Sequence, residues 1–418
     1  MSKFLVSIIL VIATIIIVIV FVLFPPSFLE STYSVSISTT EISKVDSAPI
    51  PSLVVHLKTP EPLKALYMTS CVASQESWRS NLKKLIDTTE LNAVVIDIKD
   101  YTGIVSFPRL LVPEYSNGRQ EKGCVVSDMK EYIHALHEKN IYVIGRISVF
   151  QDPFYTSIFP EFAVKKISDG QVWKDFKGLS FIDVGAKPYW DYIVELSKEA
   201  YALGFDELNY DYVRYPSDGN IKDALYTWTP NQEQSSGTGQ ASTTQSSRLM
   251  TKAEVLESFF AYLHDSLKDT GVKTSVDLFG MTTTVENDMG IGQVLELSLP
   301  YFDYISPMVY PSHYPKTWNG FTNPAEYPYE VVKIAMTRGI EREREHNISI
   351  GNFSVDINGA TSTPSSKFRP WLQDFNLGAT YDVDKVRAQI QATYDVGLTS
   401  WMLWSAANKY TVSALLLE

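Results

Sequence analysis

Two aspartates, Asp211 and Asp277, lie near the ends of two short apolar segments, 207–213 and 273–279, that we predict to be strands. A carboxylate that a strand carries into the interior is costly unless it has a partner or a chemical task. Side chains alternate between the two faces of a strand, and this alternation turns both carboxyls inward. Two carboxyls on neighbouring strands can hydrolyse a glycoside, because one protonates the leaving oxygen while the other attacks the anomeric carbon or activates water.

Other polar and aromatic side chains are predicted to line the same interior or its mouth. Those that we expect to bind substrate are Asp97, Arg146, Glu207, Asn209, Arg214, Tyr310, His313, Trp401 and Trp404. Either arginine could keep one carboxyl ionised, and aromatic rings could stack on sugars, although a single ring is more often part of the core. The alternative for the acids is a structural ion-pair network, with Asp97 paired to Arg146 and Glu207 paired to Lys99.

The elements that must position these residues alternate along the chain from about residue 62. The predicted strands are Ala65–Ser70, Ala93–Ile98, Ile141–Val149, Glu207–Val213, Lys273–Phe279, Tyr304–Val309, Ile348–Val355 and Ser400–Trp404. Amphipathic helical segments separate most of them, which favours an α/β fold, a (β/α)8 TIM barrel over residues 61–418. A doubly wound open sheet is the main alternative, but no glycine-rich phosphate loop follows the first strand.

The first 60 residues differ in composition from the rest of the chain. Residues 4–24 are almost entirely apolar and long enough for a single transmembrane helix. Lys3 precedes this segment and the next basic residue is Lys44, so the positive-inside rule predicts a cytoplasmic N-terminus and an extracytoplasmic domain. We expect residues 1–24 to be an uncleaved signal anchor in the cell membrane; a cleaved signal peptide is the alternative. Residues 25–60, rich in Ser, Thr and Pro, are predicted to form a stalk.

The composition also bears on partners and cofactors. The 418 residues carry a net charge of −12, which argues against a nucleic-acid partner. The 6 histidines lack metal-binding spacing, so we expect neither a metal nor another cofactor. Cys71 and Cys124 could form a disulfide outside the cytoplasm, or could be two unrelated thiols. The low-complexity insertion at 231–247 could cover the cleft as a flap or simply extend from the surface.

Several motifs together resemble a known family, the putative glycosyl hydrolase domain DUF4015. They are Lys64–Ser70, Leu91–Asp100 with Gly103, Gly145–Phe150, Phe205–Pro216, Ser275–Gly280, Ile305–His313 and Trp401–Trp404. The resemblance covers roughly residues 62–410 and implies a barrel related to the α-amylase-like glycosidases, acting on a carbohydrate substrate.

By position, the resemblance implies that Asp211 is the nucleophile and Asp277 the general acid/base. Two positions differ from the amylase-like pattern, which has an arginine where this chain has Asn209 and a glutamate where it has Asp277. We therefore expect a membrane-anchored, extracytoplasmic glycoside hydrolase. A catalytically inactive glycan-binding barrel at the cell surface is the alternative, and a metal-dependent esterase is disfavoured by the scarcity of histidines.

Overall fold

The computed structural model describes residues 54–108, 123–229, 250–355 and 361–417, which belong to one compact unit, Val54–Glu418. The predicted anchor at 1–24, most of the predicted stalk and the insertion at 231–247 lie outside the described residues. Within the described ranges, no helix has the length and apolar character needed to cross a membrane.

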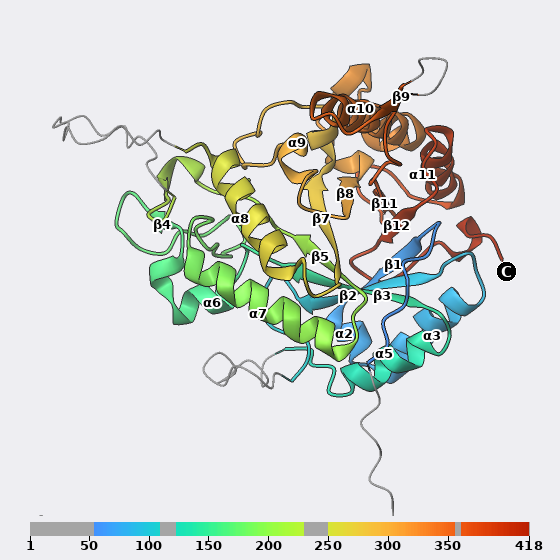
Figure 1. Ribbon diagram of the computed structural model, residues 1–418, viewed down its shortest axis with the longest axis horizontal. Coiled ribbons are helices and arrows are strands. Elements are labelled where there is room, and N and C mark those ends of the chain that lie inside the picture. Colours follow the sequence, from blue (N-terminus) through green and yellow to red (C-terminus); the bar gives the residue numbers. More distant parts are fainter. Residues whose placement is uncertain (1–53, 109–122, 230–249, 356–360, 418) are drawn as a thin grey trace, which may run out of the picture. The chain divides into compact units, whose positions relative to one another are not determined.

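Eight parallel strands close into a barrel in the order β1-β12-β11-β8-β7-β5-β3-β2, which confirms the predicted architecture (Figure 1). They are β1 (Lys64–Met68), β2 (Ala93–Lys99), β3 (Tyr142–Ser148), β5 (Glu207–Asp211), β7 (Lys273–Phe279), β8 (Tyr304–Val309), β11 (Trp371–Gln373) and β12 (Trp401–Trp404). Two small antiparallel pairs lie outside the barrel: β4 (Lys165–Lys166) with β6 (Ala224–Leu225), and β9 (Ser354–Val355) with β10 (Thr361–Ser362).

Helices connect and cover the strands (Figure 1). They are α2 (Ser70–Ala73), α3 (Glu76–Asp87), α5 (Met129–His137), α6 (Pro153–Ile158), α7 (Lys187–Leu203), α8 (Lys252–Leu267), α9 (Leu295–Ser298), α10 (Pro328–Ser349) and α11 (Val383–Asp395). Local signals set several boundaries. The Thr251 and Glu254 side chains form a capping box at the start of α8, and α7 is capped at its C-terminal end by Gly204, whose φ of 122° favours glycine.

The predicted seventh strand, 348–355, is wrong. Helix α10 continues through Ser349, because no glycine or proline interrupts it between Gly339 and Gly351. The side chains that suggested a strand are largely exposed, with Ile350 at 60% and Val355 at 56%. The seventh barrel strand is β11, which pairs with β8 and β12 in parallel.

Two apolar layers follow from the alternation along the strands. The inner layer fills the barrel and includes Ala65, Val95, Ile144 and Met402, whereas the outer layer packs the strands against the helices. Trp401 belongs to the outer layer.

The last residues of the predicted stalk contact the barrel. The Leu57 amide donates to Asp206 Oδ1 at 2.7 Å, and the His56 ring stacks on Tyr201 at 3.8 Å between centroids. Asp206 immediately precedes β5, so this contact lies at the amino ends of the strands. The chain therefore enters the barrel at the end opposite to the carboxyl ends.

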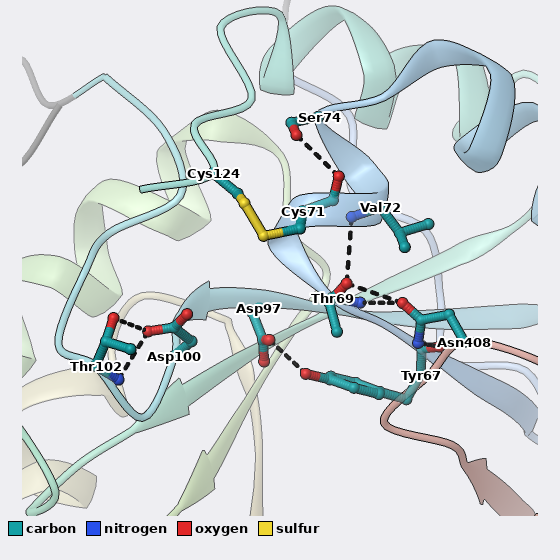
Figure 2. Close-up of a disulfide and its surroundings, with 10 residues drawn as sticks. All are labelled: Tyr67, Thr69, Cys71, Val72, Ser74, Asp97, Asp100, Thr102, Cys124 and Asn408. Carbon is teal, nitrogen blue, oxygen red and sulfur yellow. Dashed lines mark hydrogen bonds between the residues drawn. A yellow bond between two sulfur atoms is a disulfide. The ribbon is translucent and has the colours of Figure 1, made fainter. Parts of the chain in front are cut away.

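A disulfide joins Cys71 in α2 to Cys124 in the connection between β2 and α5, so the cysteines are not unrelated thiols. Figure 2 shows this bond together with the hydrogen bond from the Tyr67 hydroxyl to Asp97. Because α2 follows β1, the disulfide ties together the chain segments that leave β1 and β2 at their carboxyl ends.

Candidate active site

The guanidinium of Arg146 is the centre of the candidate site. Arg146 lies on β3, and its Nη1 donates to Asp97 Oδ1 on β2 at 2.7 Å. Its Nη2 and Nε donate to Asp211 Oδ2 on β5, and its Nε lies 4.0 Å from Asp277 Oδ2 on β7. All four side chains are buried. The structure thus brings together three predicted acids from three strands around one predicted arginine.

The register of the barrel explains this meeting. Asp97 is aligned with Arg146 across β2 and β3, and Asp211 is aligned with Ser148, two residues further along β3. These positions lie toward the carboxyl ends of the strands, where TIM barrels hold their catalytic groups. The predicted ion pair between Asp97 and Arg146 is confirmed.

Asp277 is held by neutral donors. Its Oδ1 accepts hydrogen bonds from Asn209 Nδ2 and from Trp371 Nε1, each at 2.8 Å. Burial raises the pKa of Asp277 well above its usual range, and the neighbouring charge of Asp211 raises it further. Arg146 and the two hydrogen bonds oppose this shift without cancelling it. Asp277 therefore holds its proton more tightly than an exposed aspartate does.

Asp211 is held by charged and backbone donors. It accepts from Arg146, and its Oδ1 accepts from the Tyr212 amide. Tyr212 has a φ of 52°, a left-handed conformation that is uncommon for a residue with a side chain. Asp211 Oδ2 and Asp277 Oδ2 lie 3.2 and 4.0 Å from the same Arg146 Nε. The two oxygens are thus at most about 7 Å apart, which is no further than the carboxyl pairs of inverting glycosidases can be.

Asp97 completes the cluster. Burial raises its pKa to about 6, against the opposing effects of Arg146 and the Tyr67 hydroxyl. Burial alone would lower the pKa of Arg146, but the charges of Asp211 and Asp97 raise it well above its usual range. Arg146 therefore stays cationic and orients the acids on either side of it.

Aromatic rings form one wall of the site. Trp404 on β12 is half-buried and stacks on Tyr67 with 3.9 Å between ring centroids. The Arg146 Cζ lies 5.0 Å from the Trp404 ring, and the Trp371 ring stands perpendicular to Trp404 at 5.5 Å. The ring centroids of Tyr310 and Trp404 lie 6.5 Å apart. Of these rings, Trp404 and Tyr310 were predicted at the site.

Tyr67 and Trp371 are site residues that the sequence analysis missed. Trp371 lies on β11, whose position was predicted wrongly. Tyr67 lies on a strand whose position was predicted nearly correctly, from 65 to 70, and shares the inward alternation of Ala65. Counting every second residue from Ala65 is the signal that would have found it.

Two predicted substrate-binding residues lie elsewhere. Trp401 is fully buried in the outer layer, where its Nε1 donates to the Tyr394 hydroxyl at 3.0 Å. Glu207 begins β5 and pairs with Arg369 at 2.8 Å, away from the carboxyl ends. The structure therefore does not bring these two residues together with the cluster around Arg146.

The predicted pair of Glu207 with Lys99 is also wrong. Lys99 Nζ lies 3.0 Å from Asp152 Oδ2 and donates to the Tyr189 hydroxyl. The register between β2 and β3 shifts between Asp97 and Lys99, which takes Lys99 out of the inward alternation. The interior of the barrel at this level therefore has Arg146 as its cation.

Two further predicted residues border the site. His313 is exposed after β8 and lies 5.3 Å from the Tyr310 ring. Arg214 is buried among aromatic rings beyond the end of β5 and makes no ion pair with Asp211 within 4.0 Å. Of the two arginines considered for Asp211, Arg146 is the one that pairs with it. Across the described ranges, no group of three or more His, Cys, Asp or Glu side chains is arranged to hold a metal ion.

Comparison with known protein families places the chain in one of them. Residues 65–410 match the model of the putative glycosyl hydrolase domain, DUF4015. No curated protein sequence matches the chain.

Two solved structures with a TM-score of 0.52 share the fold. The glycoside hydrolase domain of PgaB (BpsB) from Bordetella bronchiseptica has a TM-score of 0.52 and 11% identity, over 82% of this chain and 94% of that one. Alpha-L-fucosidase isoenzyme 2 from Paenibacillus thiaminolyticus has a TM-score of 0.52 and 12% identity, over 84% of this chain and 48% of that one. A hypothetical protein from Ruminiclostridium thermocellum is 30% identical over 51% of this chain and 96% of its own, with a TM-score of 0.42.

Proposed function

Because the chain belongs to the putative glycosyl hydrolase domain family, we propose that Asp211 and Asp277 together hydrolyse a glycosidic bond in an oligo- or polysaccharide. The observation that carries this proposal is the contrast between the two carboxyls. Arg146 pairs with Asp211, whereas Asp277 is buried among neutral donors and has a raised pKa. Glycosidases need this combination of one anionic and one protonated carboxyl.

Each carboxyl has one role in the proposed reaction. Asp277 donates its proton to the glycosidic oxygen as the bond from that oxygen to the anomeric carbon breaks. Asp211 either attacks the anomeric carbon, forming a glycosyl ester that water then hydrolyses with Asp277 as the base, or removes a proton from the water that attacks this carbon directly. Arg146 is a positioning residue that donates two hydrogen bonds to Asp211 Oδ2 and fixes its orientation. The face of Trp404, which is half-buried, offers a stacking surface for a sugar ring.

The proposed location is the outer face of the cell membrane. The apolar segment 4–24 and the Ser/Thr/Pro-rich segment after it support an anchor and a stalk. The disulfide between Cys71 and Cys124 supports an oxidising compartment, because such bonds are rare in the cytosol. Protease treatment of intact cells, followed by detection of the chain in the membrane fraction, tests this location: a protected domain or a soluble chain would contradict it.

The activity is tested with the full-length chain on a library of oligo- and polysaccharides. We expect release of reducing ends by the wild type and its loss in the double variant Asp211→Asn/Asp277→Asn. Circular dichroism checks that the double variant is folded. Binding without cleavage by the wild type would instead support a glycan-binding barrel, and cleavage that survives in the folded double variant would exclude these two residues.

A further inference from the structure

Arg214 is a buried cation whose donors are largely unused in the described part of the chain. The residue is 9% exposed, and no described carboxylate lies within 4.0 Å of its guanidinium. Among described acceptors, only the Tyr215 carbonyl accepts from it, at 3.0 Å from Nη1. An arginine has five N–H donors, and buried charged groups normally have partners. The guanidinium is thus desolvated without the charge compensation that burial requires.

Arg214 also lies beside residues that directly follow the two proposed catalytic aspartates in the chain. It follows Asp211 by three residues, and its Cζ lies 5.0 Å from the ring centroids of both Tyr212 and Phe279. Phe279 ends β7, two residues after Asp277. Both rings are only half-buried, so this cage borders the surface at the carboxyl ends of the strands.

The cage holds the guanidinium without neutralising it. Aromatic faces attract the flat faces of a guanidinium and leave the N–H groups at its edge able to bind an acceptor. Burial lowers the pKa of Arg214, and the more distant charges of Asp211, Asp218 and Asp175 offset this only in part. An anion would supply the missing compensation.

We propose that Arg214 binds a carboxylate of an acidic sugar in the glycan that the Asp211–Asp277 site cleaves. This inference rests on the proposed function and names its substrate class. A guanidinium matches a planar carboxylate with two parallel hydrogen bonds, and each is charge-assisted. A neutral sugar would leave the buried guanidinium unpaired, so the same residue disfavours neutral glycans.

Two sources can supply this carboxylate. One is the ring carboxylate of a uronic acid, and the other is the carboxylate of a lactyl ether on an amino sugar. The probes are therefore oligosaccharides of glucuronic or galacturonic acid and oligosaccharides that contain N-acetylmuramic acid. Each probe is paired with its carboxyl-reduced, neutral counterpart, so the members of a pair differ only in the charged group.

The test compares three variants of the full-length chain with the wild type. Arg214→Met keeps an apolar side chain within the ring cage and removes the charge, whereas Arg214→Lys keeps the charge and loses the planar fork. Arg338→Met is the matched control, because Arg338 lies on α10 and pairs with Glu286 at 3.3 Å. Thermal unfolding establishes that each variant is folded.

The measured quantity is the ratio of kcat/KM on an acidic probe to kcat/KM on its neutral counterpart. We expect a wild-type ratio of about ten or more for one of the two sources, by the strength of a charge-assisted pair. Arg214→Met should lower this ratio about tenfold, Arg214→Lys should lower it less, and Arg338→Met should not change it. A ratio that is equal in the wild type and in Arg214→Met overturns the inference, while hydrolysis of any probe still supports the proposed function.

Binding separates the two proposals if no probe is cleaved. Titration calorimetry measures the affinity of the wild type and of Arg214→Met for each pair of probes. A preference for the acidic probe that depends on Arg214 would support the inference and contradict the proposed hydrolysis. Equal affinities for both members of every pair would overturn the inference.

Discussion

Replacing each proposed catalytic aspartate, Asp211 or Asp277, by asparagine should show whether their charge states differ. Asparagine has the shape of a protonated carboxyl group. In Asp277→Asn the Oδ1 atom can still accept hydrogen bonds from Asn209 and Trp371. The new amide nitrogen takes the place of Asp277 Oδ2, which lies 4.0 Å from Arg146 Nε and makes no hydrogen bond to it. In Asp211→Asn the amide removes the charge that pairs with Arg146.

The two variants should therefore differ in stability. Removing one partner of a buried ion pair costs about 3 to 5 kcal/mol, and we expect about 3 kcal/mol for Asp211→Asn because Asp97 remains beside Arg146. Asp277→Asn should change the free energy of unfolding by less than about 1 kcal/mol, because Oδ1 can still accept from Asn209 and Trp371 and the 4.0 Å approach of Oδ2 to Arg146 is too long for a hydrogen bond. Urea unfolding followed by tryptophan fluorescence measures both values.

The two variants should also differ in kinetics. Without its acid, Asp277→Asn should lose about 10²- to 10⁴-fold in rate on the natural glycan. It should lose far less on an aryl glycoside of the same sugar with a good leaving group, since that bond breaks without protonation. Asp211→Asn should lose activity on both substrates.

Two results would refute this reasoning. Equal destabilisation of the two variants would mean that Asp277 is ionised and paired in the native protein. Equal loss of Asp277→Asn on the glycan and on the aryl glycoside would mean that Asp277 is not the acid.

Three further predictions concern the surroundings of the site. The pKa of Asp97 is raised from 3.8 to about 6, so its proton is bound more tightly in the folded state and stability is lost as the pH rises from 4 to 6. This contribution is roughly 3 kcal/mol, and the loss of stability between pH 4 and 7, measured by urea unfolding, should be clearly smaller in Asp97→Asn than in the wild type. Glu207→Gln leaves Arg369 buried without its carboxylate and should destabilise the fold by about 3 to 5 kcal/mol; a change in kcat of the folded variant would contradict its structural role. Cys71→Ser removes the disulfide between two cysteines 53 positions apart and should lower the free energy of unfolding by about 4 kcal/mol. A reductant should destabilise the wild type but not this variant.

Much of the barrel could be predicted because strands buried on both faces are continuous apolar segments bounded by turns. The alternation within them placed Asp97, Arg146, Asp211 and Asp277 on inward faces, and the structure joins these four in one cluster. This alternation is a local property of each strand, so the inward face can be predicted without knowing which strands are neighbours.

The level of a side chain along the barrel axis could not be predicted from this alternation. Glu207 and Asp211 share a face but are four residues apart, about 13 Å along the strand. One therefore pairs near the amino end of β5 and the other faces the mouth. Only the stagger of the closed barrel decides which level a side chain occupies, and that stagger depends on all eight strands.

Short strands and register shifts also escaped prediction. Strand β11 has three residues, Trp371–Gln373, which is too few for a period to appear. The shift after Asp97 turns Lys99 toward Asp152, and no pattern in the segment 93–99 indicates it. Trp371, the donor to Asp277, was lost for the first reason.

Because Lys99 points away from the barrel interior, it does not add a second positive charge beside the acids of the site. Three carboxyls, Asp97, Asp211 and Asp277, surround the single guanidinium of Arg146, so full ionisation would leave an excess of two negative charges in a buried space. Groups coupled this closely titrate together, and their apparent pKa values belong to the cluster as a whole. A substitution at any one of the three should therefore shift the pH–rate profile of the others. The register shift between β2 and β3 excludes Lys99 from the cluster, and we therefore expect it to influence the pH range of activity.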